Sequence, residues 1–186
     1  MRASLFVASI DWVGMNALAK EVATDYESVI ARYKDMVYGI ALSHTRNRSD
    51  AEDVFQEVFL VYHKKQPRFE SSERQKAWLI VTTINCARQI TTSSWQKKVV
   101  LIREQLEDRD ANEQIRFRTD EQDTVFLALQ ELPARYKTVL YLHYFEDLSV
   151  TQISKTLGIE VGTVKVQLFR GRALMRERLK GEYFNE

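Results

Sequence analysis

The sequence has little of what breaks helices or cross-links chains. Its 186 residues include two prolines, six glycines and one cysteine. A single cysteine excludes an internal disulfide and any zinc site built from several cysteines, and it fits a reducing compartment. Cys86 lies in an apolar run, so we interpret it as a buried core thiol. No apolar run approaches the roughly 18 residues that a membrane-spanning helix needs.

The chain also lacks a charge excess and a recognisable catalytic pattern. It has 27 Lys and Arg against 26 Asp and Glu, a formal net charge of +1, so only the distribution of charge can indicate an anionic partner. His44, His63 and His143 lie far apart without metal-binding spacing, and no glycine-rich phosphate loop occurs. We interpret His44 and His63 as surface residues and place His143 near a helix end. The sequence predicts no catalytic residue, enzyme activity, metal, cofactor or small-molecule substrate.

The first residues do not form a convincing signal peptide. The apolar run Leu5–Ile10 stops at Asp11, which is shorter than the roughly 7–15 apolar residues of a signal peptide. We expect a loose N-terminal tail over residues 1–20, with Met15 as an alternative start of translation. The protein is predicted to be cytoplasmic.

Helix-forming composition and periodicity predict an all-α fold. Apolar residues recur at spacings of three and four over residues 25–45, as in an amphipathic helix. A second helix is expected from Ser49 to about Lys64, with Ser49 as N-cap and Glu52 as its capping-box partner. A third is expected over about 72–91. No alternating run bounded by hairpin turns indicates a strand.

Residues 104–124 are nearly all polar and read as a linker. Helices are expected on both sides of Pro133, and two more follow them. We therefore predict two small helical domains joined by a polar linker. The predicted division is an N-terminal tail over residues 1–20, a first domain over 21–100, a linker over 101–121 and a second domain over 122–183.

The stretch LSVTQISKTLGIEVGTVKVQLFRGR, residues 148–172, has the spacing of a helix-turn-helix. Ser149 can cap the first helix, and Gln152 can reach back as its capping-box partner. Ser154 is small enough for a second helix to cross closely, and Gly158 permits the left-handed turn. Val164 then anchors the second helix. The second domain is therefore predicted to be the helix-turn-helix domain.

The second helix of this motif concentrates positive charge. Residues 165–180 hold six Lys and Arg against Glu177 alone, about +5 in an otherwise neutral chain. A solvated amphipathic helix is the alternative interpretation, but the turn glycine and apolar anchors in register favour a helix that enters the major groove of DNA. We expect base contacts from Lys165, Gln167 and Arg170, and phosphate contacts from Arg172 and Arg176.

The predicted first domain carries two further groups of residues. SDAEDVFQEVFLVYHKK, residues 49–65, places acidic and amide side chains on one polar helix face. Further on, aromatic and basic residues alternate in a way that suits single-stranded nucleic acid, whose bases stack on rings. We interpret Trp78 as a core residue rather than a stacking platform. The remaining members of this second group are Phe69, Trp95, Arg88, Lys97 and Lys98.

The order of DAEDVFQEVFL, AWLIVTTIN, a polar linker and LPARYKTVLYLHYFEDLSVTQISKTLGIEVGTVK resembles an extracytoplasmic-function (ECF) sigma factor of bacterial RNA polymerase, over about residues 22–182. The helix-turn-helix alone is shared with LuxR-type regulators, so the pairing of both motifs carries the resemblance. It implies binding to core RNA polymerase and promoter-specific initiation. The alternative is a free-standing helix-turn-helix regulator that does not bind core polymerase. Such a regulator needs a ligand pocket or a phosphorylatable aspartate, and the sequence indicates neither.

The resemblance implies roles for individual residues of the first domain. Asp53, Gln56 and Glu57 fall on the helix that binds the clamp helices of the largest polymerase subunit. Phe69 and Asn85 match positions that hold a flipped base of the −10 element, because an amide can pair with a base only once that base has left the stack. The −10 and melting group also includes Arg88, Lys97 and Lys98.

The second domain corresponds to the −35 reader, and the resemblance implies further partners. Where the family often has Ser and Arg, this chain has Val166 and Gln167, so the promoter sequence cannot be copied from a relative. The implied partners are core polymerase, including its flap, promoter DNA, and an anti-sigma factor that holds the protein at the inner membrane face. The implied −35 residues are Lys165, Val166, Gln167, Phe169, Arg170, Arg172 and Arg176.

Overall fold

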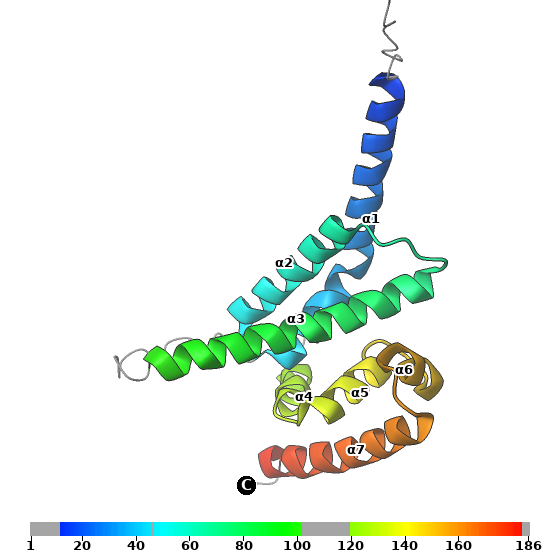
Figure 1. Cartoon of the computed structure of the whole chain (residues 1–186). Helices are drawn as coiled ribbons and strands as arrows, with labels where there is room; N and C mark the ends of the chain where they lie inside the picture. Colours follow the sequence, from blue (N-terminus) through cyan, green and yellow to red (C-terminus); the bar gives the residue numbers. More distant parts are fainter. Residues whose placement is uncertain (1–11, 46, 102–119, 184–186) are drawn as a thin grey trace, which may run out of the picture. The chain divides into compact units, whose positions relative to one another are not determined.

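The computed structural model describes the backbone of residues 12–45, 47–101 and 120–183, and the side chains of 26–45, 47–92 and 124–180. All regular structure within these ranges is helical, which confirms the predicted fold class (Figure 1). Most of the predicted linker, residues 102–119, lies outside them. The helices are α1 (Trp12–His44), α2 (Arg48–Lys65), α3 (Ser72–Leu101), α4 (Asp120–Gln130), α5 (Ala134–Tyr144), α6 (Val150–Leu157) and α7 (Val161–Tyr183).

The chain divides into two compact units, residues 1–34 and 35–186. Helix α1 begins in the first unit at Trp12, earlier than the predicted 25–45, so the expected tail over residues 1–20 overlaps this helix. In that unit Val29 and Tyr33, four residues apart, are buried on one face of α1. The Arg32 guanidinium lies 5.6 Å from the centre of the Tyr33 ring.

Helix α2 begins one residue earlier than predicted, and its cap differs. The Asn47 side chain accepts a hydrogen bond from the Asp50 amide at 2.7 Å and donates to the Asp50 carboxylate at 3.0 Å. Asparagine is at least as strong an N-cap as serine, so the earlier residue starts the helix and Ser49 falls inside it. The predicted capping box of Ser49 and Glu52 was therefore wrong. Glu52 instead pairs with Arg48 at 3.1 Å.

Helices α2 and α3 pack against each other and supply much of the first core. Val54 and Val58 of α2 and Leu79 and Ile80 of α3 are completely buried. Cys86 of α3 is also buried, as predicted, and burial raises the pKa of its thiol. Helix α3 continues to Leu101, beyond the predicted end near residue 91.

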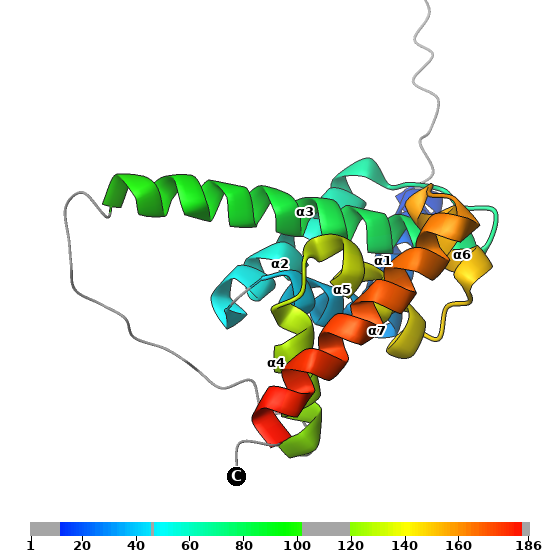
Figure 2. The same cartoon turned by 90° about the horizontal axis from the view of Figure 1, so that it is seen from below.

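The second core lies where α7 packs on α4, α5 and α6 (Figure 2). Its centre consists of Leu129, Val139, Ile153, Val164 and Leu168, each at most 3% exposed. These residues come from four different helices, and two of them, Val164 and Leu168, lie one turn apart on α7. The buried stripe of α7 fixes which of its other faces meets solvent.

Side chains from α4 and α5 cap the C-terminal end of α1 within the second unit. Gln130 donates to the Leu42 carbonyl at 2.6 Å, and the Lys137 ammonium donates to the Ser43 carbonyl at 3.1 Å and to the Gln130 carbonyl. The last carbonyls of a helix have no partner inside it, and a cation there also meets the negative end of the helix dipole. This arrangement explains why the buried Lys137 is tolerated.

His44, at the end of α1, was predicted to be a surface residue, but it is half-buried. Its Nε2 lies 3.1 Å from the Thr138 hydroxyl. Burial, with the positive charges of Lys137 and Arg88, lowers the pKa of His44 to about 3. His143 lies near the end of α5, as predicted, with Nδ1 2.9 Å from the Leu148 carbonyl.

Candidate nucleic-acid interface

The helix-turn-helix forms as its sequence predicts. Gln152 donates its amide to the Ser149 hydroxyl at 3.3 Å, and the Ser149 amide donates to the Gln152 side chain at 2.9 Å. Gly158 ends α6 with φ of +65°. Ser154 donates its hydroxyl to the Ile159 carbonyl at 2.6 Å, which ties the end of α6 to the turn. The turn therefore delivers α7 in a fixed direction.

The first half of α7 presents an exposed face with both cations and apolar groups. Lys165 and Arg170 are exposed, as predicted, while Phe169 is 70% and Val166 49% exposed. Large apolar side chains left in solvent at this density indicate a contact surface. Gln167, by contrast, is half-buried and lines a cleft that is described below. Five residues in this half of α7 were predicted to contact the −35 element, and all of them except Gln167 are exposed on this face.

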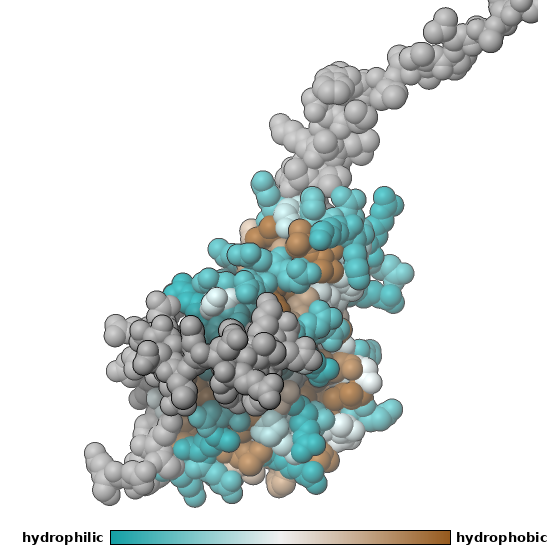
Figure 3. Space-filling model, turned by 60° about the vertical axis from the view of Figure 1, so that its left-hand side comes forward, coloured by the Kyte–Doolittle hydropathy of each residue, from teal (hydrophilic) through white to brown (hydrophobic). Residues whose placement is uncertain are grey.

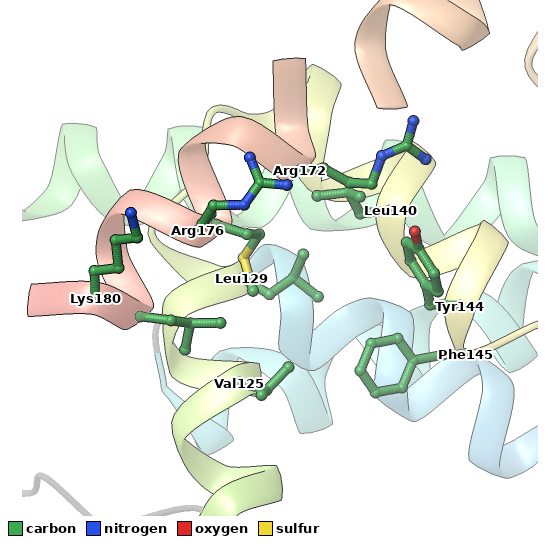
Figure 4. Close-up of a pocket in the computed structure, with 10 residues that line it drawn as sticks. Val125, Leu129, Leu140, Tyr144, Phe145, Arg172, Arg176 and Lys180 are labelled. Atoms are coloured by element: carbon green, nitrogen blue, oxygen red, sulfur yellow. The ribbon is translucent and has the colours of Figure 1, made fainter. Parts of the chain in front are cut away.

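The second half of α7 lines an apolar groove that sequence reasoning missed. The groove has a volume of about 800 Å³ and is formed with α4 and the end of α5. In Figure 4, Arg172, Arg176 and Lys180 extend from α7 along it, with Leu129 and Val125 beneath them. Three of its lining residues, Val125, Tyr144 and Phe145, are 37%, 55% and 47% exposed, a property of the fold that leaves no pattern in the sequence. Figure 3 shows apolar patches among hydrophilic side chains on one face of the molecule.

Arg178, near the end of α7, forms an ion pair with Glu131 at the end of α4. Helical i,i+4 spacing would also bring Glu182 near Arg178, but Glu182 lies outside the residues whose side chains are described. The observed partner comes from a distant part of the chain, which spacing along one helix cannot reveal.

The predicted polymerase-binding residues come together on α2. Asp53, Gln56 and Glu57 are exposed and line one shallow groove with Leu60, which is 43% exposed. The far side of this groove is formed by Cys86, Gln89 and Ile90 of α3. Leu60 was missed although it follows Gln56 by four residues and Glu57 by three, a helical spacing that already places it on the same face of α2.

The predicted −10 residues are only partly brought together. Phe69 lies in the loop between α2 and α3, half-buried, with its ring stacked on Tyr62 at 6.5 Å and tilted against Trp78 at 5.9 Å. Asn85 and Arg88 are exposed, one turn apart on α3. They line a cleft that does not include Phe69. Lys97 and Lys98 lie in α3 but outside the residues whose side chains are described, as does Trp95.

The cleft beside Asn85 and Arg88 also involves helices of the second domain. Arg135 of α5 and Gln167 of α7 line it, and its volume is about 200 Å³. Predicted −10 and −35 residues therefore share one small cleft. Among the residues that the structure describes, no cluster of three or more His, Cys, Asp or Glu could hold a metal ion. No helix in the described part is long and apolar enough to cross a bilayer.

A helix-turn-helix whose second helix is exposed and basic is typical of a DNA-binding protein. Comparison with known families identifies the kind of DNA-binding protein. Residues 29–96 match the family model "Sigma-70 region 2", and residues 123–175 match "Sigma-70, region 4". The chain is 33% identical over 158 residues to RNA polymerase sigma factor SigV of Bacillus subtilis, covering 82% of this chain and 90% of the relative. It belongs to the RNA polymerase sigma factors of the ECF type and directs promoter recognition by the polymerase.

Two further comparisons agree with this family assignment. ECF RNA polymerase sigma factor SigW of Bacillus subtilis is 25% identical over 170 residues, covering 83% of this chain and 89% of the relative. A structure of the sigma factor RpoE from Bartonella quintana, in complex with the anti-sigma factor NepR, shares the fold with a TM-score of 0.63 and 21% identity, over 84% of this chain and 97% of that one. Family membership confirms that the protein is not an enzyme. The region 2 match supports a sigma factor over a free-standing regulator.

Proposed function

We propose that the exposed face of Asp53, Gln56 and Glu57 on α2 binds the clamp helices of core RNA polymerase. The supporting observation is their grouping in one groove with the exposed Leu60. An interface of this kind combines an apolar anchor with charged groups that fix orientation. The acidic groups suit a basic partner.

We place the −10 element at α3 and the preceding loop. Asn85 and Arg88 offer an amide and a cation on an exposed helix face, where an unstacked base and its phosphate could be held. Phe69 lies in a three-ring cluster with Tyr62 and Trp78. In this proposal the cluster is an aromatic wall beside the melted strand.

We place the −35 element at the first half of α7. Lys165, Gln167 and Arg170 supply groups that bond base edges, and Val166 can contact a thymine methyl. Arg172 and Arg176 lie further along the helix, where side chains approach the phosphate backbone. Phe169, at 70% exposure, completes this surface.

The apolar groove beside α7 is assigned to a protein partner. It is lined by apolar residues, and Lys180 stands at its rim beyond the two arginines assigned to phosphate, so it suits an amphipathic helix with an acidic flank. The polymerase flap is the partner that family membership suggests for this domain. An anti-sigma factor would compete for such surfaces, and the fold is shared with a sigma factor solved in complex with the anti-sigma factor NepR. The proposal includes a cytoplasmic location, with retention at the inner membrane face by the anti-sigma factor.

Run-off transcription with core polymerase over genomic fragments tests the assignment. We expect transcripts from a small set of promoters only when the protein is added, and co-elution with core polymerase in gel filtration. Binding to DNA without co-elution or transcripts would instead favour a free-standing regulator. A pull-down from native cells should recover a small inhibitor. Recovery of polymerase alone, with constitutive transcription from the same promoters, would contradict the anti-sigma assignment.

A further inference from the structure

Polar contacts join the first and second domains at two places, both within the second compact unit. At the end of α1, the Gln130 side chain of α4 donates to the carbonyls of Leu42 and Thr45, at 2.6 and 3.3 Å. On α3, the Lys76 ammonium lies 2.9 Å from the carboxylate of Glu146, which follows α5. The side chains of this ion pair are only 30% and 12% exposed. Domains that are joined at two places cannot pivot freely about either one.

A close steric fit accompanies these polar contacts. Gly39 of α1 lies directly against the hydroxyl of Tyr141 of α5, because a Cβ atom at position 39 would overlap that oxygen and lie 3.1 Å from the ring carbon that carries it. The Tyr141 ring is 6% exposed and stacks on Phe145, with the ring centres 4.9 Å apart. A buried, stacked ring has little room to move aside. Gly39 is therefore the position at which α1 admits a side chain of the second domain.

The buried polar groups of this contact are satisfied. Lys137 of α5 is 8% exposed, and its ammonium donates to the Ser43 carbonyl of α1 at 3.1 Å. The Thr138 hydroxyl lies 3.1 Å from His44 Nε2. Throughout the described side chains, every buried nitrogen and oxygen has a hydrogen-bond partner, as in a native protein interior. Packing and pairing of this quality are typical of a specific interface.

The contact brings both proposed DNA-reading surfaces to one place. Asn85 and Arg88 of α3 line the same cleft as Gln167 of α7, together with Leu157 and Ile159 at the turn. Elements at −10 and −35 lie about 25 base pairs apart, or about 85 Å along B-DNA, so one cleft of about 200 Å³ cannot face both. Helix α6 also packs on α3 (Figure 1), although the first helix of a bound helix-turn-helix must cross the DNA backbone.

The proposed polymerase-binding groove, in contrast, stays accessible. Asp53, Gln56 and Glu57 are exposed, and the residues that line their groove all come from α2 and α3. The contact between the domains therefore covers DNA-reading groups while it leaves the polymerase-binding groups open.

We propose that this contact is autoinhibitory: it holds the free protein closed, and it must open before the −10 and −35 elements can both be read. The inference rests on the proposed functions of α3 and α7. Apparent affinity falls in proportion to the fraction of molecules that are competent to bind. The free wild-type protein should therefore bind a −35 duplex more weakly than a variant whose domains have separated.

The Lys76–Glu146 ion pair offers a charge-exchange test. Lys76→Glu places two carboxylates opposite each other and should open the protein, whereas Lys76→Glu combined with Glu146→Lys should restore the pair. Arg74→Glu is the matched control, because Arg74 carries the same charge on the same helix but pairs at 3.3 Å with Glu70 of its own domain. Small-angle X-ray scattering measures the radius of gyration. Titration of a duplex with the −35 element of a promoter found by run-off transcription measures DNA affinity.

We expect Lys76→Glu to increase the radius of gyration and to tighten binding of the −35 duplex about three- to tenfold. Added negative charge by itself weakens DNA binding, so electrostatics cannot cause this gain. The exchanged double variant should return both quantities to wild-type values, and Arg74→Glu should not increase either of them.

A steric variant tests the same contact independently. Gly39→Ala adds a methyl group that overlaps the Tyr141 hydroxyl, and it should open the protein although alanine favours the helical state of α1 more than glycine does. Adding Tyr141→Phe removes the overlapping oxygen and should restore closing in part.

Three outcomes would overturn the inference. If Lys76→Glu and Gly39→Ala leave the radius and the affinity at wild-type values, the contact is not inhibitory and the −35 assignment stands. If both variants lower the melting temperature and weaken DNA binding, the contact serves stability alone. If the variants expand but no form of the protein prefers the −35 duplex to a scrambled one, the proposed −35 function fails, and autoinhibition fails with it.

Discussion

Ser149 and Gln152 close the first turn of α6 reciprocally, each accepting a hydrogen bond from the backbone amide of the other at 2.9–3.3 Å. Helix α6 has only eight residues, so its stability depends heavily on this cap and on packing. The cap therefore supports the turn that delivers the recognition helix.

Replacing the cap should weaken the whole second domain. Ser149→Ala is expected to lower the free energy of unfolding by about 1 kcal/mol and to weaken −35 binding of all sequences alike. Ser149→Asp, which retains an acceptor, should lose little. Thermal unfolding of the three proteins checks this. Equal midpoints for wild type and Ser149→Ala would show that the cap contributes nothing.

The elements that the sequence predicted correctly are those that depend on neighbouring residues. The capping box, the left-handed Gly158 and the buried Val164 all follow from spacing within one motif. The prediction of the N-cap of α2 was wrong because two nearby residues, Asn47 and Ser49, are both favourable N-caps. In the structure Asn47 is the N-cap. Residue type alone does not decide between caps two positions apart.

The features that sequence reasoning missed depend on distant contacts. The low pKa of His44 arises from burial and from the charge of Lys137, which follows it by about half the chain. The apolar groove combines residues of α4, α5 and α7 that show no common periodicity. The close approach of α7 to Leu140 of α5 at Gly171 likewise joins residues from different helices. None of these relationships leaves a pattern along the chain.

The groove on α2 should carry the polymerase contact. Asp53→Ala combined with Gln56→Ala is expected to weaken core polymerase binding, by about 2–5 kcal/mol if the charge becomes buried in the complex and by less at a rim. Isolated −35 binding and the melting temperature should stay unchanged. Glu52→Ala is the control, since Glu52 is an exposed acidic residue of α2 that pairs with Arg48 and does not line the groove. Unchanged affinity for core polymerase would refute the assignment.

Substitutions at Asn85 and Phe69 should impair promoter opening rather than initial binding. Asn85→Ala is the cleaner variant because the side chain is exposed, whereas Phe69→Ala also disrupts packing with Tyr62 and Trp78. A pre-melted promoter should restore part of the lost activity by removing the unstacking cost. Rates of open-complex formation on duplex and pre-melted templates measure this. Identical defects on both templates would exclude a melting role, and a large drop in melting temperature for Phe69→Ala would show that Phe69 is a core residue.

His44 should make the protein less stable in acid. Its pKa is lowered from 6.5 to about 3 in the folded protein, so protonation favours the unfolded chain. Above pH 6.5 His44 is neutral in both states, so it does not change the free energy of unfolding with pH. As the pH falls from 6.5 toward 3, the free energy of unfolding decreases by up to about 1.4 kcal/mol per pH unit. Urea unfolding at pH 7.5, 6 and 5 should therefore show a steeper loss for wild type than for His44→Gln. Parallel pH profiles would mean that folding does not lower the pKa of His44.

The two halves of α7 should differ in what they contribute to DNA binding. Arg170→Ala is expected to relax base preference at one or two −35 positions, because a bidentate base contact is worth about 1–3 kcal/mol of discrimination. Arg176→Ala should weaken all sequences alike and reduce the salt slope by about one, as loss of a phosphate contact does. Arg178→Ala should have a smaller effect, since Arg178 already pairs with Glu131. Binding titrations against a panel of −35 point mutants at two salt concentrations separate these effects. If Arg170→Ala lost affinity uniformly while Arg176→Ala changed base preference, α7 would enter the groove with the opposite end, and the assignment of reading and phosphate residues would have to be reversed.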